Sequence, residues 1–298
     1  MEIGRLLTAM VTPFDASGAV DYVQAKRLAL ALIDSGSDGV VLAGTTGEAP
    51  TLSHDEKMRL FVEVKEAVGS PGAVVAGTGT YNTAESVELS REAERQGVDA
   101  VLLTCPYYSK PTQEGLFRHF ETIARAVSLP CIMYNIPGRT GVNMTAETQV
   151  RLSQIENIAG VKEASGDLAQ IARIIEESRP GFRVWSGDDQ MTLPILSIGG
   201  YGVISVVSHL AGAQMREIVH SYLAGNVEEA SHVHRRLLPL MTVLMTAAGN
   251  PGGVKHALNG IGFRVGAPRL PLVEADGAAG ELIMAEVERQ RIDLAVAV

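Results

Sequence analysis

A lysine inside an apolar stretch is the residue of this sequence best suited to covalent chemistry. Lys162 lies in residues 158–165, a run that is typical of a short buried strand. Lysine is almost never fully buried without a partner, and burial lowers its pKa from an ordinary value of about 10.4. A lysine that is uncharged for part of the time near neutral pH can attack a ketone and form a Schiff base. We therefore predict that Lys162 is a Schiff-base nucleophile.

The alternative is that Lys162 lies at a strand end, reaches water and pairs with Glu163. Among the other lysines, Lys255 is the only competing candidate, because it follows a Gly-Gly-Val run near the C-terminus. Lys162 is preferred because it alone sits in a strand that follows five strands of the same kind. The remaining lysines lie in charged, helix-like stretches or in a loop: Lys26, Lys57, Lys65 and Lys110.

A Gly-Thr-Thr-Gly-Glu motif at 44–48 follows the second strand-like run. Glycines let backbone amides approach a ligand, and successive amides in a turn can hold an anion. The hydroxyls of Thr45 and Thr46 could orient a carboxylate or relay a proton. The alternative is an ordinary turn before a helix.

Tyrosines and an arginine follow two further runs. Tyr107 and Tyr108 come after residues 99–104, Tyr134 ends the next run, and Arg139 lies in the loop behind it. A tyrosine beside a Schiff-base lysine can pass protons to and from the substrate oxygen, and an arginine fork suits a carboxylate. Packing of the tyrosines and a surface salt bridge of the arginine are equally compatible with the pattern.

No metal is expected. Asp188 and Asp189 follow Gly187, but no histidine or further carboxylate accompanies them, and we expect Asp188 to cap the next helix. His232 and His234 are two residues apart, so they lie on different faces of a helix, and we expect both at the surface.

The elements that must position these residues alternate between strand-like and helix-like segments, which indicates a parallel sheet in an α/β fold. Eight such units favour a closed (β/α)8 TIM barrel, whose active site lies in the loops after the strands. Beyond about Ser208 the pattern is helical only. We expect residues 1–207 to form the barrel, and 208–298 to form its last helix and a C-terminal helical extension, all in one folded unit. The predicted strands are residues 6–11, 39–43, 73–76, 99–104, 131–134, the run with Lys162, 182–185 and 203–207.

Composition narrows the function. The net charge of −9 gives no support for binding to nucleic acid or to an anionic membrane. Cys105 and Cys131 do not make a disulfide framework, and no apolar run reaches the roughly 18 residues of a membrane helix. We expect a soluble, cytoplasmic protein with no membrane association.

The motifs together resemble those of a known group of enzymes. The 44–48 motif, the Tyr-Asn-Ile-Pro run at 134–137 and the Gly-Val-Lys-Glu run at 160–163 are similar to those of the pyruvate-dependent Schiff-base aldolases and lyases, the superfamily of dihydrodipicolinate synthase and N-acetylneuraminate lyase. The runs 106–108, 139–141 and 187–189 are similar to those of its dihydrodipicolinate synthase branch. The resemblance covers about Leu6 to Gly262. It implies a lyase of lysine and diaminopimelate biosynthesis that condenses pyruvate with L-aspartate 4-semialdehyde.

The resemblance also implies residue roles. Lys162 would condense with pyruvate, and the amides of Thr45 and Thr46 would hold the pyruvate carboxylate. Tyr134, Thr46 and Tyr108 would relay protons, with Tyr108 reaching across from a neighbouring subunit. The protein would then be a homo-oligomer, usually a dimer of dimers in this family, and would need no cofactor.

Further roles concern the second substrate. Arg139 would bind the carboxylate of the semialdehyde, while Gly187 and the carbonyl of Ile204 would line the pocket near the lysine. A rival with the same chemistry is an N-acetylneuraminate lyase or a 2-keto-3-deoxy sugar acid aldolase, against which Arg139 argues. A catalytically silent barrel is a rival of another class, against which the intact lysine, tyrosines and threonines argue.

Some members of this family are inhibited by lysine at a subunit interface. The matching positions here include His54, Glu85 and Tyr107. Lys57 and Tyr81 depart from the lysine-sensitive pattern, because Lys57 adds positive charge where a cationic effector would bind. We expect weak or absent inhibition by lysine.

Overall fold

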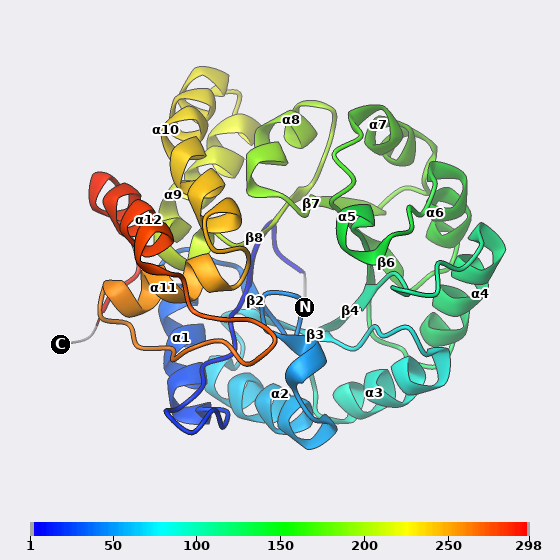
Figure 1. The fold of residues 1–298 in the computed structure, drawn as a ribbon. Helices are drawn as coiled ribbons and strands as arrows, with labels where there is room; N and C mark the ends of the chain where they lie inside the picture. The colour runs from blue at the N-terminus through cyan, green and yellow to red at the C-terminus, as the bar shows by residue number, and fades with distance from the viewer. Residues whose placement is uncertain (1–2, 297–298) are drawn as a thin grey trace.

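The computed structural model describes residues 3–296 and contains a closed barrel of eight parallel strands, hydrogen-bonded in sequence order (Figure 1). This confirms the predicted (β/α)8 fold. The observed strands begin or end within a few residues of the predicted runs. They are β1 (Leu6–Ala9), β2 (Gly39–Leu42), β3 (Ala73–Gly77), β4 (Ala100–Thr104), β5 (Cys131–Asn135), β6 (Ile158–Glu163), β7 (Arg183–Ser186) and β8 (Gly202–Ser205).

Helices form a ring around the barrel, and those that end the chain stack beyond α9 on one side of it (Figure 1). The ring helices are α1 (Tyr22–Asp34), α2 (His54–Val68), α3 (Thr83–Arg95), α4 (Gln113–Ala124), α6 (Ala146–Ser153), α7 (Leu168–Glu177), α8 (Thr192–Ser197) and α9 (Ser208–Leu223). The short helix α5 (Pro137–Thr140) lies inside this ring, after β5 (Figure 1). The extension consists of α10 (Val227–Thr246), α11 (Gly252–Gly260) and α12 (Gly277–Arg289). Among residues 3–296, no helix is both long and apolar enough to cross a membrane.

The strands are apolar on both faces because each face is covered. One set of side chains, including Leu7, Ile132 and Trp185, fills the inside of the barrel. The alternate set, including Val40, Met133 and Val161, packs between the barrel and the helices. Since successive side chains of a strand point to opposite faces, a polar residue among them points either into the barrel or toward the helices. Because of this alternation, the side chains of the neighbouring residues Lys162 and Glu163 point to opposite sides of the barrel wall.

Capping residues start the helices that follow β2 and β3. Ser53 accepts a hydrogen bond from the Glu56 amide, and the Glu56 carboxylate accepts one from the Ser53 amide, which is a complete capping box. At α3 only half of a capping box forms. Asn82 caps the helix, but the Glu85 carboxylate accepts from the Thr80 hydroxyl at 3.0 Å.

The C-terminal extension differs from the sequence prediction in two respects. Residues 261–276 between α11 and α12 contain no helix, although we expected only helical structure there. His234 is buried rather than exposed, because α10 also packs against the short helix Asp189–Met191, where the ring of His234 meets the Gln190 backbone. His232 is exposed as expected.

Candidate active site

Lys162 points into the barrel from β6. It pairs in register with Tyr134 on β5 and Trp185 on β7, both of which belong to the interior cluster. The side chain is buried, and its Nζ lies 4.4 Å from the centre of the Tyr134 ring. The alternative of a lysine that reaches water is therefore wrong. Glu163, the partner in that alternative, points the other way, toward the helices.

Burial lowers the pKa of Lys162 from 10.5 to about 8. The buried carboxylate of Asp189 opposes this shift in pKa, and the Arg139 guanidinium adds to it. A pKa near 8 leaves about a tenth of the amines uncharged at pH 7, which is enough for a nucleophile.

Lys255, the competing candidate, is buried on α11 but has a different partner. Its Nζ lies 2.6 Å from Glu48 Oε1, and both side chains are fully inaccessible to solvent. Burial lowers its pKa, but hydrogen bonding to Glu48 acts in the opposite direction. This ion pair holds the Lys255 proton, so Lys255 is a poor nucleophile.

The two adjacent threonines have separate roles. The Thr45 hydroxyl bonds to Tyr134, and burial raises the pKa of Tyr134 to about 12. The Thr46 hydroxyl accepts a hydrogen bond of 2.8 Å from Asn250 Nδ2 instead. Our expectation of a relay through Thr46 is corrected on this point, since it is Thr45 whose hydroxyl contacts the tyrosine. A residue 204 positions away holds the other hydroxyl, and no local sequence signal indicates it.

Gly187 lies beside the side chain of Lys162. A Cβ built on Gly187 would lie 3.1 Å from Lys162 Cγ and 2.8 Å from Ala164 Cβ, so a larger residue would displace the lysine. Ile204 is buried in the interior cluster on β8. Asp188 caps the short helix Asp189–Met191, as the sequence predicted. Asp189, which the sequence did not single out for the site, accepts hydrogen bonds from the amides of residues 206 and 207 at 2.9 and 3.0 Å.

Glu163 fixes β6 to β5 behind the site. Its carboxylate accepts hydrogen bonds from Asn135 at 3.0 Å, Gln149 at 2.9 Å and the Ser165 amide at 3.0 Å. All but Ser165 are fully buried. Because Asn135 follows Tyr134 and Glu163 follows Lys162, this network holds the two catalytic candidates in register.

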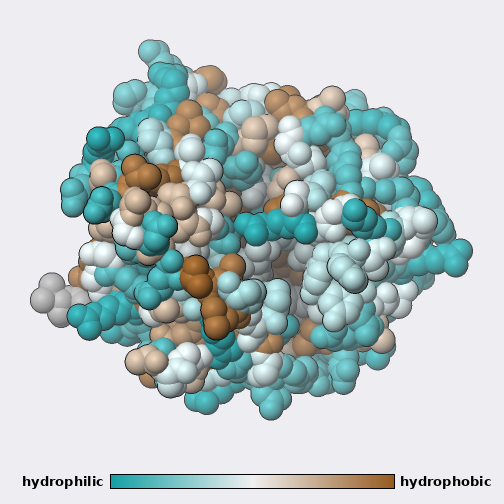
Figure 2. All heavy atoms as spheres, viewed as in Figure 1, coloured by the Kyte–Doolittle hydropathy of each residue, from teal (hydrophilic) through white to brown (hydrophobic). Residues whose placement is uncertain are grey.

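A cavity of about 570 Å³ opens at the carboxyl ends of β2 to β5. Figure 2 shows the molecule hollowed near the middle of this view. Thr45, Thr104, Arg139 and Asn250 line the cavity. Arg139 is exposed at its rim and close enough to influence the pKa of both Lys162 and Tyr134. The cavity therefore has the Arg139 guanidinium at its rim, near the buried amine of Lys162.

Tyr108 is not brought to Lys162 within one chain. Its side chain is 93% exposed, and its backbone has φ +71°, which is uncommon for an aromatic residue. The tyrosine thus projects into solvent away from its own cavity.

The three candidate regulatory residues are only partly assembled. Glu85 and Tyr107 line the far end of the cavity together with Lys57 and Tyr81, whose ring meets Tyr107 edge-on. His54 does not line it, because its ring is 2.8 Å from Glu92.

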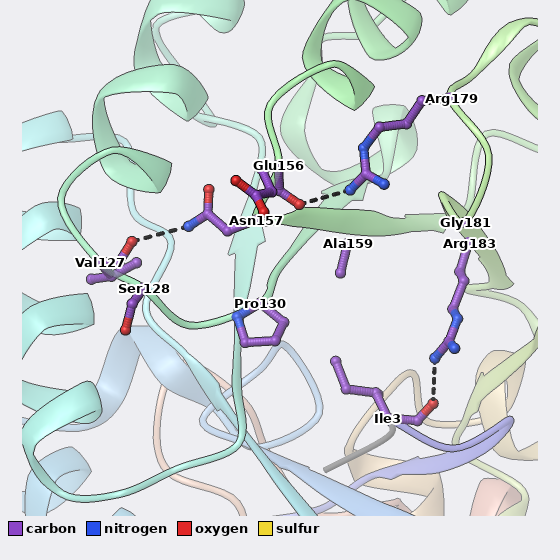
Figure 3. Close-up of a pocket in the computed structure, with 10 residues that line it drawn as sticks. All are labelled: Ile3, Val127, Ser128, Pro130, Glu156, Asn157, Ala159, Arg179, Gly181 and Arg183. Atoms are coloured by element: carbon purple, nitrogen blue, oxygen red, sulfur yellow. Dashed lines mark hydrogen bonds between the residues drawn. The ribbon is translucent and has the colours of Figure 1, made fainter.

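A second hollow, of about 960 Å³, lies at the opposite end of the barrel, before β5 to β7 (Figure 3). Its arginines bind backbone carbonyls: Arg179 bonds to the carbonyl of Glu156 at 2.7 Å, and Arg183 bonds to that of Ile3 at 3.1 Å. The active sites of such barrels lie at the other end. Over residues 3–296, no group of three or more His, Cys, Asp or Glu side chains is arranged to hold a metal.

The fold and the site define a class: a (β/α)8 barrel with a partly deprotonated lysine at its mouth. A sequence model of the dihydrodipicolinate synthetase family matches residues 2–290, and the chain belongs to this family of lyases. It is 55% identical over 295 residues to a 4-hydroxy-tetrahydrodipicolinate synthase of Dehalococcoides mccartyi, covering 99% of each chain.

Solved structures agree. A dihydrodipicolinate synthase from Bacillus anthracis superposes with a TM-score of 0.95 at 41% identity, covering 97% of this chain and 99% of that one. A synthase from Cyanidioschyzon merolae with lysine bound gives a TM-score of 0.94 at 44% identity, covering 96% and 97%. These comparisons favour the synthase over the sugar-acid aldolases.

Proposed function

We propose that this chain catalyses the reaction of the 4-hydroxy-tetrahydrodipicolinate synthases, the condensation of pyruvate with L-aspartate 4-semialdehyde in lysine and diaminopimelate biosynthesis. The observation that carries the proposal is the buried Lys162 amine, with a pKa near 8, facing Tyr134 in a barrel of this family. Arg139 at the cavity rim suits a substrate that carries a carboxylate.

The chemistry follows from the amine. Neutral Lys162 adds to the ketone carbon of pyruvate, the adduct takes up one proton, and loss of one water leaves an iminium. The iminium accepts electrons, so a methyl proton can leave and an enamine forms. The enamine carbon attacks the aldehyde of the semialdehyde, and the resulting alkoxide takes a proton. The amino group of the semialdehyde then attacks the former ketone carbon, displaces Lys162 and closes the ring.

We assign the proton transfers to Tyr134 and Thr45. A tyrosine with a pKa raised to about 12 remains protonated at neutral pH, so it can donate to the developing alkoxide. The hydroxyl of Thr45 bonds to it and can pass the proton on. The amides of Thr45 and Thr46 would receive the pyruvate carboxylate, and Arg139 that of the semialdehyde. Gly187 and the Ile204 carbonyl would line the pocket beside the imine.

Borohydride trapping tests the central step. Reduction of the protein with pyruvate should add one pyruvate-derived mass, located at Lys162 by peptide mapping. Lys162→Ala should abolish the adduct and turnover with aspartate semialdehyde. Lys26→Ala, which removes a surface lysine paired with Glu63, should retain both. An adduct at Lys255, or full turnover by Lys162→Ala, would refute the assignment.

We further propose that the working enzyme is a homo-oligomer, in which Tyr108 completes the relay of a neighbouring copy. The exposed Tyr108, Leu270 and Val273 support this proposal, because large apolar side chains at 93%, 78% and 66% exposure are suited to a protein interface. A dimer of dimers is the arrangement we expect, and light scattering after gel filtration measures it.

Subunit mixing tests the role of Tyr108. The inactive Lys162→Ala and Tyr108→Phe variants, unfolded and refolded together, should regain activity, because a hybrid pair contains one site with both native residues. If Tyr108 served its own chain, every site in the mixture would lack one residue and activity would stay absent.

We also propose that the protein resides in the cytoplasm and that the extension unfolds together with the barrel as one unit. Cys105 and Cys131 are both free and buried, which fits a reducing compartment. A single calorimetric transition is expected for the whole chain, and two separated transitions would contradict the single unit.

A further inference from the structure

The C-terminal extension returns to the mouth of the barrel at Thr46. Asn250, in the turn between α10 and α11, donates from Nδ2 to the Thr46 hydroxyl at 2.8 Å. The same asparagine lines the active-site cavity beside Thr45 and Arg139. A side chain of the extension is thus part of the site.

Thr46 belongs to the loop of residues 44–48, and two further contacts hold the other end of this loop. Glu48, which ends the Gly-Thr-Thr-Gly-Glu motif, makes the buried ion pair with Lys255 of α11 at 2.6 Å. Its second carboxylate oxygen accepts a hydrogen bond of 2.8 Å from the Arg269 amide, in the non-helical segment before α12. The extension therefore binds the loop at two positions, Thr46 and Glu48.

The loop needs external support because its ends are strained. Ala43 has φ +49° and Glu48 has φ +57°, in the left-handed region that favours glycine. Such conformations cost free energy and persist only where surrounding contacts impose them. Gly47 lets the loop lie close to the backbone of Ala43 and Met10. A Cβ at this position would lie 3.0 Å from the Ala43 amide nitrogen and 3.1 Å from the Met10 carbonyl oxygen.

We propose that Asn250 is a positioning residue for the keto acid. By holding the Thr46 hydroxyl, it keeps the amides of Thr45 and Thr46 in the orientation that receives the pyruvate carboxylate, while the Lys255–Glu48 pair anchors the loop. This inference rests on the proposed function. Asn250 acts through Thr46 and does not touch the ketone carbon.

The test separates pyruvate binding from the rest of catalysis. Borohydride trapping of Lys162 at increasing pyruvate, without aldehyde, gives the half-saturating concentration for wild type, Asn250→Ala, Thr46→Val and the double variant. Asn250→Ala should raise this concentration roughly threefold to tenfold, the range expected for one hydrogen bond. The KM for aspartate semialdehyde should change by less than about twofold, because Arg139 is untouched.

The double variant decides whether Asn250 acts through Thr46. If it does, the double variant should need no more pyruvate than Thr46→Val alone; additive effects would overturn the proposal. Unchanged half-saturation in Asn250→Ala would overturn it as well. If Asn250→Ala does not fold, Thr46→Val removes the same hydrogen bond from the other side. Unchanged pyruvate saturation in Thr46→Val would also overturn the proposal.

Asn259→Ala is the matched control. Asn259 lies on α11 in the same extension. Its side chain donates to the Gly266 carbonyl at 3.1 Å and accepts from the Val265 amide at 2.7 Å, so these bonds go to residues outside 44–48. The Asn259→Ala variant should have a lower Tm than wild type and the same half-saturating pyruvate concentration. An equal rise in the pyruvate requirement in this control would show a general structural effect and would refute the specific role of Asn250. If wild type forms no adduct at Lys162, the proposed function itself fails, whatever the variants do.

Discussion

Replacing Lys162 with methionine should destroy the Schiff base and make the protein more stable. Methionine is unbranched, apolar and of similar length, so it can fill the same space. The folded chain lowers the pKa of Lys162 from 10.5 to about 8, so it binds this proton less tightly than the unfolded chain. At about 1.36 kcal/mol for each pKa unit, the native state loses roughly 3 kcal/mol at pH 7.

The sign of the pH dependence follows from the same shift. Below about pH 8 both states carry the proton, and the full penalty is present. Between about pH 8 and 10.5 the folded state is deprotonated while the unfolded state is still charged, so stability rises with pH relative to the methionine variant. Above that range the penalty is gone. The advantage of Lys162→Met should therefore be largest at neutral pH and vanish near pH 10.5.

Thermal unfolding of both proteins across pH 7 to 11 measures the effect. For a chain of this length, about 3 kcal/mol corresponds to roughly 5 °C in Tm at pH 7. Lys26→Met, at the surface pair with Glu63, is the control and should lack this pH dependence. A Lys162→Met variant no more stable than wild type at pH 7, or a difference that stays constant up to pH 11, would refute the reasoning.

Two other predictions concern charged residues around the cavity. Millimolar L-lysine should leave turnover nearly unchanged, because Lys57 and Tyr81 occupy the far end of the cavity with Glu85; strong inhibition in a steady-state assay would contradict this. Lys255→Met should destabilise the fold by about 3–5 kcal/mol, since it leaves the Glu48 carboxylate buried without its partner, and adding Glu48→Gln should restore part of the loss. Denaturant unfolding checks the second prediction, and a wild-type midpoint for Lys255→Met would rule it out.

Sequence patterns predicted the barrel because its constraints are periodic. Eight apolar runs at regular spacing, each followed by a helix, leave few other arrangements. The same patterns place chemistry at strand ends, so Lys162, Tyr134, Arg139 and the threonine motif were all predicted at the mouth. Strand limits were less accurate. The first predicted strand, 6–11, ends at Ala9. The Met10 amide makes the last bond to β2, at 3.0 Å from the Val41 carbonyl, and the Val11 amide donates to His209 Nε2 at 3.1 Å instead.

What could not be predicted depends on irregular backbone and distant contacts. Thr45, and not its neighbour Thr46, bonds to Tyr134. The motif that carries both lies between two left-handed residues, Ala43 and Glu48, and residue types alone do not indicate such backbone. The bond from Asn250 spans 204 residues, and no periodic pattern links it to Thr46. A spacing of two residues puts His232 and His234 on different faces, yet it does not say which face another helix covers.

The two buried lysines show that the partner, rather than burial, sets the chemistry of the amine. Burial lowers the pKa of both Lys162 and Lys255. Lys255 has the Glu48 carboxylate at 2.6 Å, and this contact stabilises the charged form in a solvent-free site. Lys162 has no ion pair among residues 3–296; it faces the ring of Tyr134 at 4.4 Å, and the charge of Asp189 acts on it only at longer range. A protonated amine is therefore well stabilised on α11 and poorly stabilised on β6, so the lysine at the mouth is the one free to attack a ketone.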